Sequence, residues 1–94
     1  MKIKKNEKEN IIECLYKSST IIKSTYNLGT RVLTITFKNG GVYKYEDVNI
    51  DDYAFFECSE SQGKSMSVIK KYKFEKLDKE NVEFLIKEIE SITE

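Results

Sequence analysis

Apolar and polar residues alternate through the middle of the chain as they do in half-buried β-strands. The clearest run is Arg31 to Phe37, and the neighbouring segments are rich in β-branched and aromatic residues. We therefore expect three antiparallel strands, over residues 20–26, 31–37 and 42–48. They are separated by two segments of turn-forming residues, Asn27-Leu28-Gly29-Thr30 and Asn39-Gly40-Gly41.

The second turn determines which side chains share a face of the sheet. A two-residue Asn39-Gly40 turn would place the apolar side chains of the two strands on opposite faces. A three-residue loop with a bulge at Gly41, in the left-handed region, would pair Phe37 with Tyr43 and place them together. Because a slip of one residue moves every side chain to the other face, we predict the longer loop. The shared face, interpreted as core, would carry Leu33, Ile35, Phe37, Tyr43 and Tyr45.

Helical spacing appears on both sides of these strands. An apolar stripe near the N-terminus predicts a short helix from Ile11, Ile12, Leu15 and Tyr16. Asn49 is a suitable N-cap for a helix with Asp51 and Asp52 in its first turn. A second short helix is expected over about residues 64–72, and an amphipathic helix over residues 78–92. The stripe of this last helix is Val82, Leu85, Ile86, Ile89 and Ile92, and Phe84 lies off it.

These elements predict an α+β fold: a three-stranded antiparallel meander with helices packed on one face and an added C-terminal amphipathic helix. The chain would divide into an N-terminal arm and short helix (residues 1–17), a central domain (18–77) and the C-terminal helix (78–94). Its 94 residues, 39% of them hydrophobic, are enough for one core.

Charge is balanced overall but unevenly placed. The 16 basic and 16 acidic residues argue against purely electrostatic binding of nucleic acid. Residues 61–77, however, contain five lysines and one acidic residue. An anion-binding surface is therefore expected in this segment.

The residue types that most enzymes and metal sites use are scarce. Histidine is absent, and the two cysteines, Cys14 and Cys58, lack the spacing of a zinc site. The acidic residues near the first helix, Glu46 to Asp52, are interpreted as capping and solubilising groups. We expect neither enzyme activity nor a metal or other cofactor. No signal peptide or membrane-spanning run is apparent, so a cytoplasmic location is expected.

Two motifs in the basic segment suggest anion binding. Gly63-Lys64-Ser65 resembles the end of a phosphate-binding loop, but Cys58 stands where that loop requires glycine, which excludes a nucleoside triphosphatase. Free amides at a helix start beside Lys64 could still bind an anion; alternatively, Gly63 is only a flexible cap. Lysines around Tyr72 and Phe74 match a surface that neutralises phosphate and stacks bases. The alternative is a solvated lysine face over a core tyrosine.

Several of these residues resemble the KTSC domain family, which is named for the C-terminus of certain lysyl-tRNA synthetases. The first group comprises Ser18, Ser19, Ile21, Tyr26, Leu33, Ile35, Phe37, Asn39-Gly40-Gly41, Tyr43, Tyr45 and Val48, and the second comprises Gly63, Lys64, Ile69, Tyr72 and Phe74. The resemblance covers residues 18–77. It implies a small domain of bacteria and their viruses whose suggested role is RNA binding. Where the family usually has bulky aromatics and an asparagine, this chain has Ser65, Met66 and Ser67, so its specificity is expected to differ.

Together these observations predict a non-catalytic module that binds RNA or a small nucleotide, with sequestration of that ligand as one form of the prediction. The expected ligand-binding residues are Gly63, Lys64, Ser65, Lys70, Lys71, Tyr72 and Lys73, with Tyr43, Tyr45 and Phe74 as candidates for stacking. The alternative is a protein-interaction module, such as a viral or mobile-element inhibitor that docks on a host protein. Under either hypothesis the C-terminal helix could form a homo-oligomer.

Overall fold

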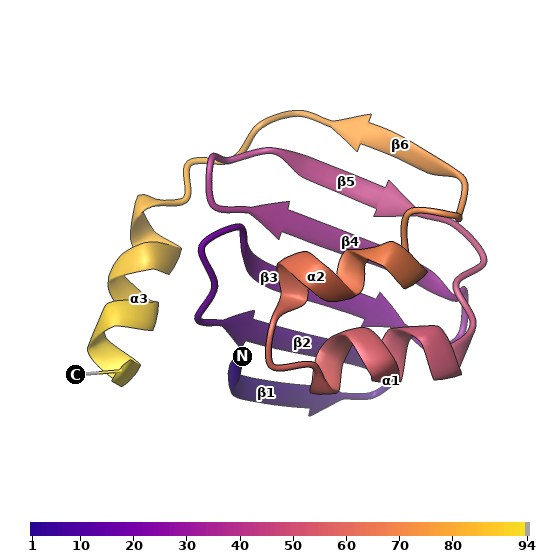
Figure 1. Ribbon diagram of the computed structural model, residues 1–94, viewed down its shortest axis with the longest axis horizontal. Coiled ribbons are helices and arrows are strands. Elements are labelled where there is room, and N and C mark those ends of the chain that lie inside the picture. Colours follow the sequence, from indigo (N-terminus) through magenta and orange to yellow (C-terminus); the bar gives the residue numbers. More distant parts are fainter. Residues whose placement is uncertain (94) are drawn as a thin grey trace.

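A single antiparallel sheet runs through the protein, and each of its six strands pairs with its neighbours in sequence (Figure 1). The computed structural model describes residues 1–93. The strands are β1 (Lys2–Lys8), β2 (Ile11–Tyr16), β3 (Ile21–Asn27), β4 (Val32–Phe37), β5 (Val42–Tyr45) and β6 (Phe74–Leu77). The helices are α1 (Ile50–Cys58), α2 (Gln62–Ser65), the 3-10 turn η1 (Met66–Val68) and α3 (Glu83–Thr93).

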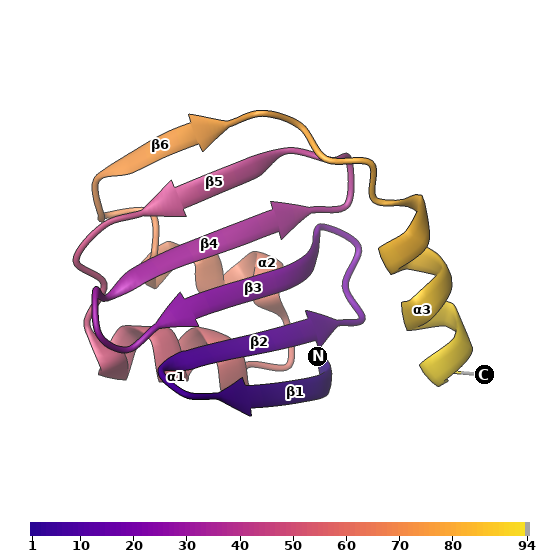
Figure 2. The ribbon, with the colours of Figure 1, turned by 180° about the vertical axis from the view of Figure 1, so that it is seen from behind.

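The two faces of the sheet are covered differently. Helices α1 and α2 lie across one face over β2 to β4, where the main core forms (Figure 1). In that core the rings of Tyr26 and Tyr53 stack with centroids 4.3 Å apart. Helix α3 lies at one end of the opposite face, which is otherwise open (Figure 2). There Ile89 packs against Leu15 and Ile22 in a second, smaller core.

The α+β class, the antiparallel sheet and the C-terminal helix are confirmed, but the expected number of strands is wrong. Residues 2–8 and 11–16 form strands where an arm and a short helix were predicted. The reason lies in burial on both faces of β2. Tyr16 is buried under α1 and α2 while its neighbour Leu15 is buried under α3. Consecutive apolar residues therefore conceal the alternation of a strand and imitate helical spacing.

The turn between β4 and β5 is a three-residue loop of Lys38, Asn39 and Gly40. The Phe37 amide donates to the Gly41 carbonyl (2.8 Å), and the Gly40 amide donates to the Phe37 carbonyl (2.9 Å). Loop length and the shared apolar face are confirmed. The pairing was wrong, because Phe37 lies opposite Gly41 while Tyr43 pairs with Ile35.

The left-handed residue of this loop is Gly40, with φ of 93°, and not Gly41 as predicted. A Cβ atom at Gly40 would lie 2.8 Å from the carbonyl oxygen of Glu80, whose amide donates to the Gly40 carbonyl (2.9 Å). This position therefore needs glycine both for its φ angle and for the close approach of another segment.

The helices follow local signals with two differences. The Asn49 side chain caps α1 by accepting from the Asp52 amide (2.8 Å), as expected. The helix predicted over residues 64–72 is shorter, because α2 ends at Ser65 and the chain turns after η1. Helix α3 begins at Glu83, and Phe84 is 77% exposed. No helix within residues 1–93 is long and apolar enough to cross a membrane.

Candidate ligand-binding groove

The predicted basic segment is partly neutralised by acidic residues that the fold brings to it. Lys71 forms an ion pair with Asp52 (2.9 Å), and Lys73 lies 4.0 Å from Glu46. The Tyr72 hydroxyl also donates to Asp52. Hydrogen bonds from Tyr72 and Lys71 lower the pKa of Asp52 below its ordinary value. Lys71 and Tyr72 therefore attach the segment to the start of α1, and Lys73 lies near the residue that follows β5, which leaves less of the lysines' charge for a ligand.

The Gly63-Lys64-Ser65 motif lies in α2 and uses its polar groups within the chain. The Lys64 amide donates to the Ser61 hydroxyl (3.4 Å), and the Ser65 amide donates to the Ser61 carbonyl (3.0 Å). The Ser65 side chain is buried and donates to the Gln62 carbonyl (3.2 Å). Gly63 has a packing role, since a Cβ atom there would lie 3.3 Å from the Thr20 hydroxyl oxygen. The side chain of Lys64 remains exposed.

Helices α1 and α2 leave the β5 and β6 part of their sheet face, here called the inner face, uncovered (Figure 1). An aromatic groove lies on this part of the inner face. The groove has a volume of about 280 Å³ and is lined by Phe37, Asn39, Gly41, Tyr43, Tyr45, Lys76 and Lys79. Phe74 of β6 lies beside it, with its ring centroid 5.8 Å from that of Tyr43 and 6.0 Å from that of Tyr45. The Phe74 side chain is 57% exposed, so its ring is accessible to a ligand.

Strand pairing between β5 and β6 creates this groove. Phe74 lies opposite Tyr45, and Lys76 lies opposite Tyr43, so all four side chains share the inner face. Glu75 points to the other face, where it pairs with Lys44 (3.3 Å). Lys76 and Lys79 form no ion pair with any residue of the described chain. The groove thus combines aromatic rings with lysines whose charge is not locally neutralised.

The two tyrosines differ in accessibility. Tyr45 is 5% exposed, and burial raises the pKa of its hydroxyl. Tyr43 is half-buried and meets Phe37 edge-to-face, with centroids 5.4 Å apart. Tyr45 therefore belongs to the core, as interpreted from the sequence, and Tyr43 lies at the edge of the core within reach of a ligand. Sequence reasoning placed Lys76 in the lysine-rich segment but not among the expected ligand-binding residues, and it missed Phe37, Asn39 and Lys79 as candidate site residues. The alternation of Phe74-Glu75-Lys76-Leu77 was the signal that could have placed Lys76 on the same face as Phe74.

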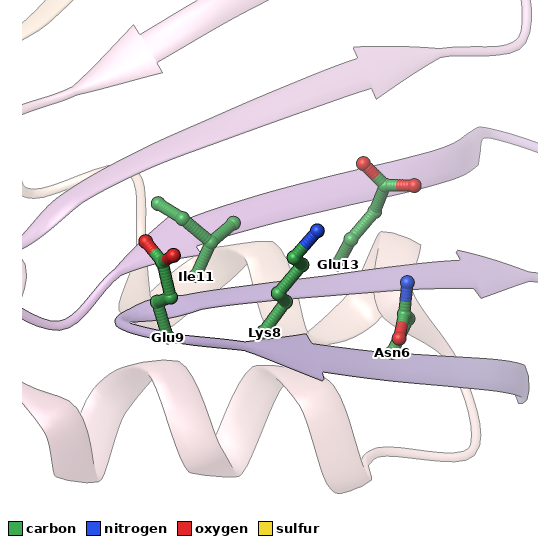
Figure 3. Close-up of a pocket in the computed structure, with 5 residues that line it drawn as sticks. All are labelled: Asn6, Lys8, Glu9, Ile11 and Glu13. Atoms are coloured by element: carbon green, nitrogen blue, oxygen red, sulfur yellow. The ribbon is translucent and has the colours of Figure 1, made fainter.

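A larger depression lies on the hairpin of β1 and β2, on the face of the sheet away from α1 (Figure 3). Its volume is about 440 Å³, and it is lined by Asn6, Lys8, Glu9, Ile11 and Glu13. Two carboxylates and one lysine give it a mixed, slightly acidic character, and no aromatic ring lines it. It is chemically less suited than the aromatic groove to a phosphate-bearing ligand.

A buried carboxylate attaches the first strand to the first helix. Glu57 of α1 is 4% exposed and accepts hydrogen bonds from Lys2 (2.9 Å), Lys5 (3.2 Å) and the Tyr53 hydroxyl (2.9 Å). Burial would raise the pKa of Glu57, but these hydrogen bonds outweigh burial and hold it below its ordinary value. Burial raises the pKa of the neighbouring Cys14 thiol. This cluster is fully paired within the chain and is interpreted as structural.

Comparison with known proteins identifies the central part of the chain. The model of the KTSC domain family matches residues 17–74. The crystal structure of a KTSC domain protein from Yersinia pestis is similar, with a TM-score of 0.66 and 29% sequence identity over 70% of this chain and 96% of that chain. No curated protein matches the chain. Strands β1 and β2, most of β6 and helix α3 lie outside the matched residues, and so do Lys76 and Lys79.

Proposed function

This chain belongs to the KTSC domain family, and from that premise and the aromatic groove we propose that it is a non-catalytic binding module for a phosphate-bearing ligand, either RNA or a small nucleotide. A base would stack on Phe74 and the edge of Tyr43. Lys76 and Lys79 would neutralise phosphate. An oligomer of this protein could sequester such a ligand.

The observation that carries this proposal is the joint presence of accessible aromatic rings and unpaired lysines in one groove. Aromatic side chains bind bases of any sequence because every base has a π-face, and nearby cations bind the backbone. The only arginine, Arg31, is exposed, lies 3.3 Å from Asp47 and does not line the groove. Arginine provides most bidentate recognition of phosphate and base edges. The composition of the groove therefore supports recognition that tolerates different base sequences.

Fluorescence anisotropy with labelled RNA oligonucleotides and with nucleotides tests the proposal. We expect Phe74→Ala to weaken binding roughly 5- to 150-fold, because a stacked base contributes roughly 1–3 kcal/mol. Lys76→Ala should lower the affinity. It should also reduce the slope of log affinity against log salt concentration by about one. Phe55→Ala and Lys87→Ala are matched controls, because Phe55 of α1 and Lys87 of α3 are exposed and neither lines the groove. The proposal is wrong if the native protein binds none of these ligands, or if Phe74→Ala binds as tightly as Phe55→Ala.

A second candidate function, protein interaction, is favoured by one feature of α3. This helix lies outside the family match and exposes Phe84 (77%) and Ile92 (42%). Exposed apolar side chains of this size often belong to interfaces. Sedimentation of the native protein and of Phe84→Ser would test self-association. We expect the native protein to sediment as an oligomer and Phe84→Ser as a monomer; a monomeric native protein would contradict a homo-oligomer formed through α3.

A further inference from the structure

The aromatic groove continues into a second depression on the far side of Phe37. This depression, here called the turn lobe, has a volume of about 360 Å³ and is lined by Ser19, Thr20, Phe37, Lys38 and Asn39. Phe37 and Asn39 also line the aromatic groove. The two concavities therefore adjoin at these two residues and form one longer surface across the β4–β5 turn.

The turn lobe is held in place by the backbone. The Lys38 amide donates to the Thr20 carbonyl (2.8 Å), which joins the β4–β5 turn to the segment between β2 and β3. The Thr20 amide in turn donates to the Ser18 hydroxyl (3.1 Å). Gly63 lies close to Thr20, so the turn lobe borders the start of α2, where Lys64 is exposed. The surface is thus formed by segments that are fixed relative to one another.

Charge and aromaticity alternate along this surface. Lys38 is exposed, lines the turn lobe and also borders a cavity that Glu90 of α3 lines, but it forms no ion pair with the residues that the structure describes. Lys76 lies opposite Tyr43 on the edge strand β6, and so on the other side of Tyr43 from β4, and Lys79 lines the same groove. No carboxylate of the described chain lines either concavity. Along this surface the order is therefore Lys38, then the rings of Phe37 and Tyr43, then Lys76 and Lys79.

We infer that the occupant of this surface is a single-stranded oligonucleotide that spans both concavities, a deduction that rests on the proposed function. A mononucleotide has its phosphate on one side of its base and can reach only one group of lysines. A strand carries a phosphate on each side of every internal base, so it matches lysines on both sides of the aromatic pair. The bases of a duplex are stacked on each other and cannot lie on protein rings. One base stacks on Phe74 and the edge of Tyr43, as proposed above, and the flanking phosphates lie by Lys38 and by Lys76 and Lys79.

Chain-length dependence of binding tests this inference on the native protein. Anisotropy would be measured with labelled oligouridylates of one, two, four and eight nucleotides, with DNA of the same lengths, and with an RNA duplex. We expect affinity to rise roughly tenfold or more from one nucleotide to four, as phosphate contacts are added, and the duplex to bind more weakly than the single strand. Tighter binding of RNA than of DNA would identify a contact to the 2′-hydroxyl, and equal binding would identify phosphate and base alone as the recognised chemistry.

Charge-reversal variants distinguish the contributions of the turn lobe and the aromatic groove to ligand affinity. Lys38→Glu should weaken binding of the four-nucleotide strand several-fold and leave binding of the mononucleotide unchanged, whereas Lys76→Glu should weaken both. Lys87→Glu on α3 is the control for net charge. The inference is overturned if the mononucleotide binds as tightly as the four-nucleotide strand, if the duplex binds equally well, or if Lys38→Glu behaves like Lys87→Glu. In those cases the proposed function stands as long as Phe74→Ala still weakens binding; it fails separately if no nucleotide or strand binds.

Discussion

Replacing Glu57 by glutamine should remove the charge that attaches β1 to α1. The Glu57 carboxylate is buried and accepts hydrogen bonds from two lysines and from Tyr53. Hydrogen bonds to charged groups contribute roughly 1.5–3 kcal/mol each, and those between neutral groups roughly half as much. The glutamine can keep the bond from Tyr53. The side chains of Lys2 and Lys5 are 30% and 34% exposed and can turn to water, which reduces the loss. We expect Glu57→Gln to lower the free energy of unfolding by about 2 kcal/mol.

The assay is urea or thermal unfolding at pH 7, where a loss of about 2 kcal/mol corresponds to a fall in Tm of roughly 8–16 °C for a chain of this size. Glu88→Gln is the matched control. Glu88 also joins β1 to another element, through Lys4 at 3.0 Å, but the two side chains are 31% and 53% exposed. Exposed pairs contribute roughly 0–1 kcal/mol. If Glu57→Gln is no more destabilising than Glu88→Gln, the reasoning about the buried carboxylate is wrong.

The loss of unfolding free energy caused by Glu57→Gln should depend on pH. The pKa of Glu57 in the folded protein is below its ordinary value of 4.5. A lowered carboxylate pKa contributes stability that is present above the unfolded pKa and is lost as the pH falls through the folded pKa. The difference between native protein and Glu57→Gln should therefore be largest near pH 7 and shrink below about pH 4.5. A difference that stayed constant down to pH 3 would assign the loss to packing.

Two further predictions concern a glycine and the cysteines. Gly40→Ala should destabilise the protein by more than about 1 kcal/mol, because the residue has a positive φ and a Cβ atom would meet the Glu80 carbonyl. Gly29→Ala, at a negative φ, is the control. Equal effects of the two substitutions in urea unfolding would contradict this account. Cys58 is exposed and Cys14 is buried with a raised pKa, so a thiol reagent should modify one cysteine quickly in the folded protein and the second only on unfolding. Rapid modification of both thiols, counted by mass spectrometry, would show that β2 opens readily.

Local features of the sequence were sufficient for part of the fold and the family. The alternation of residues 31–37 predicted a strand, and Asn49 predicted the start of α1, because each depends on contacts within a few residues. The same holds for the packed stripe of α3, where Leu85, Ile86 and Ile89, with Val82 just before the helix, pack with Leu15 and Ile22. The ordered residues around Tyr43 and Gly63 identified the KTSC domain, and the family match confirms it.

Contacts between distant segments decided the rest. The apolar residues of β2 read as a helix because two layers, α1 on one side and α3 on the other, bury both of its faces. From the sequence, Lys71 and Lys73 were expected to bind a ligand, but the fold places Asp52 beside Lys71 and Glu46 beside Lys73. These effects depend on which segments meet in three dimensions, and periodicity along the chain carries no information about that choice.

The candidate site also depends partly on local sequence and partly on contacts between distant segments. From the sequence alone, a phosphate-binding surface was expected in the lysine-rich segment, and the lysines of β6 and its end lie in or just beyond that segment. Only the pairing of β6 with β5 placed Lys76 beside Tyr43 and Phe74 beside Tyr45. Only the β4–β5 turn brought Lys38 to the other side of Phe37. The residue types were determined by the sequence, and their arrangement as a groove was determined by strand pairing, because pairing sets which side chains share a face.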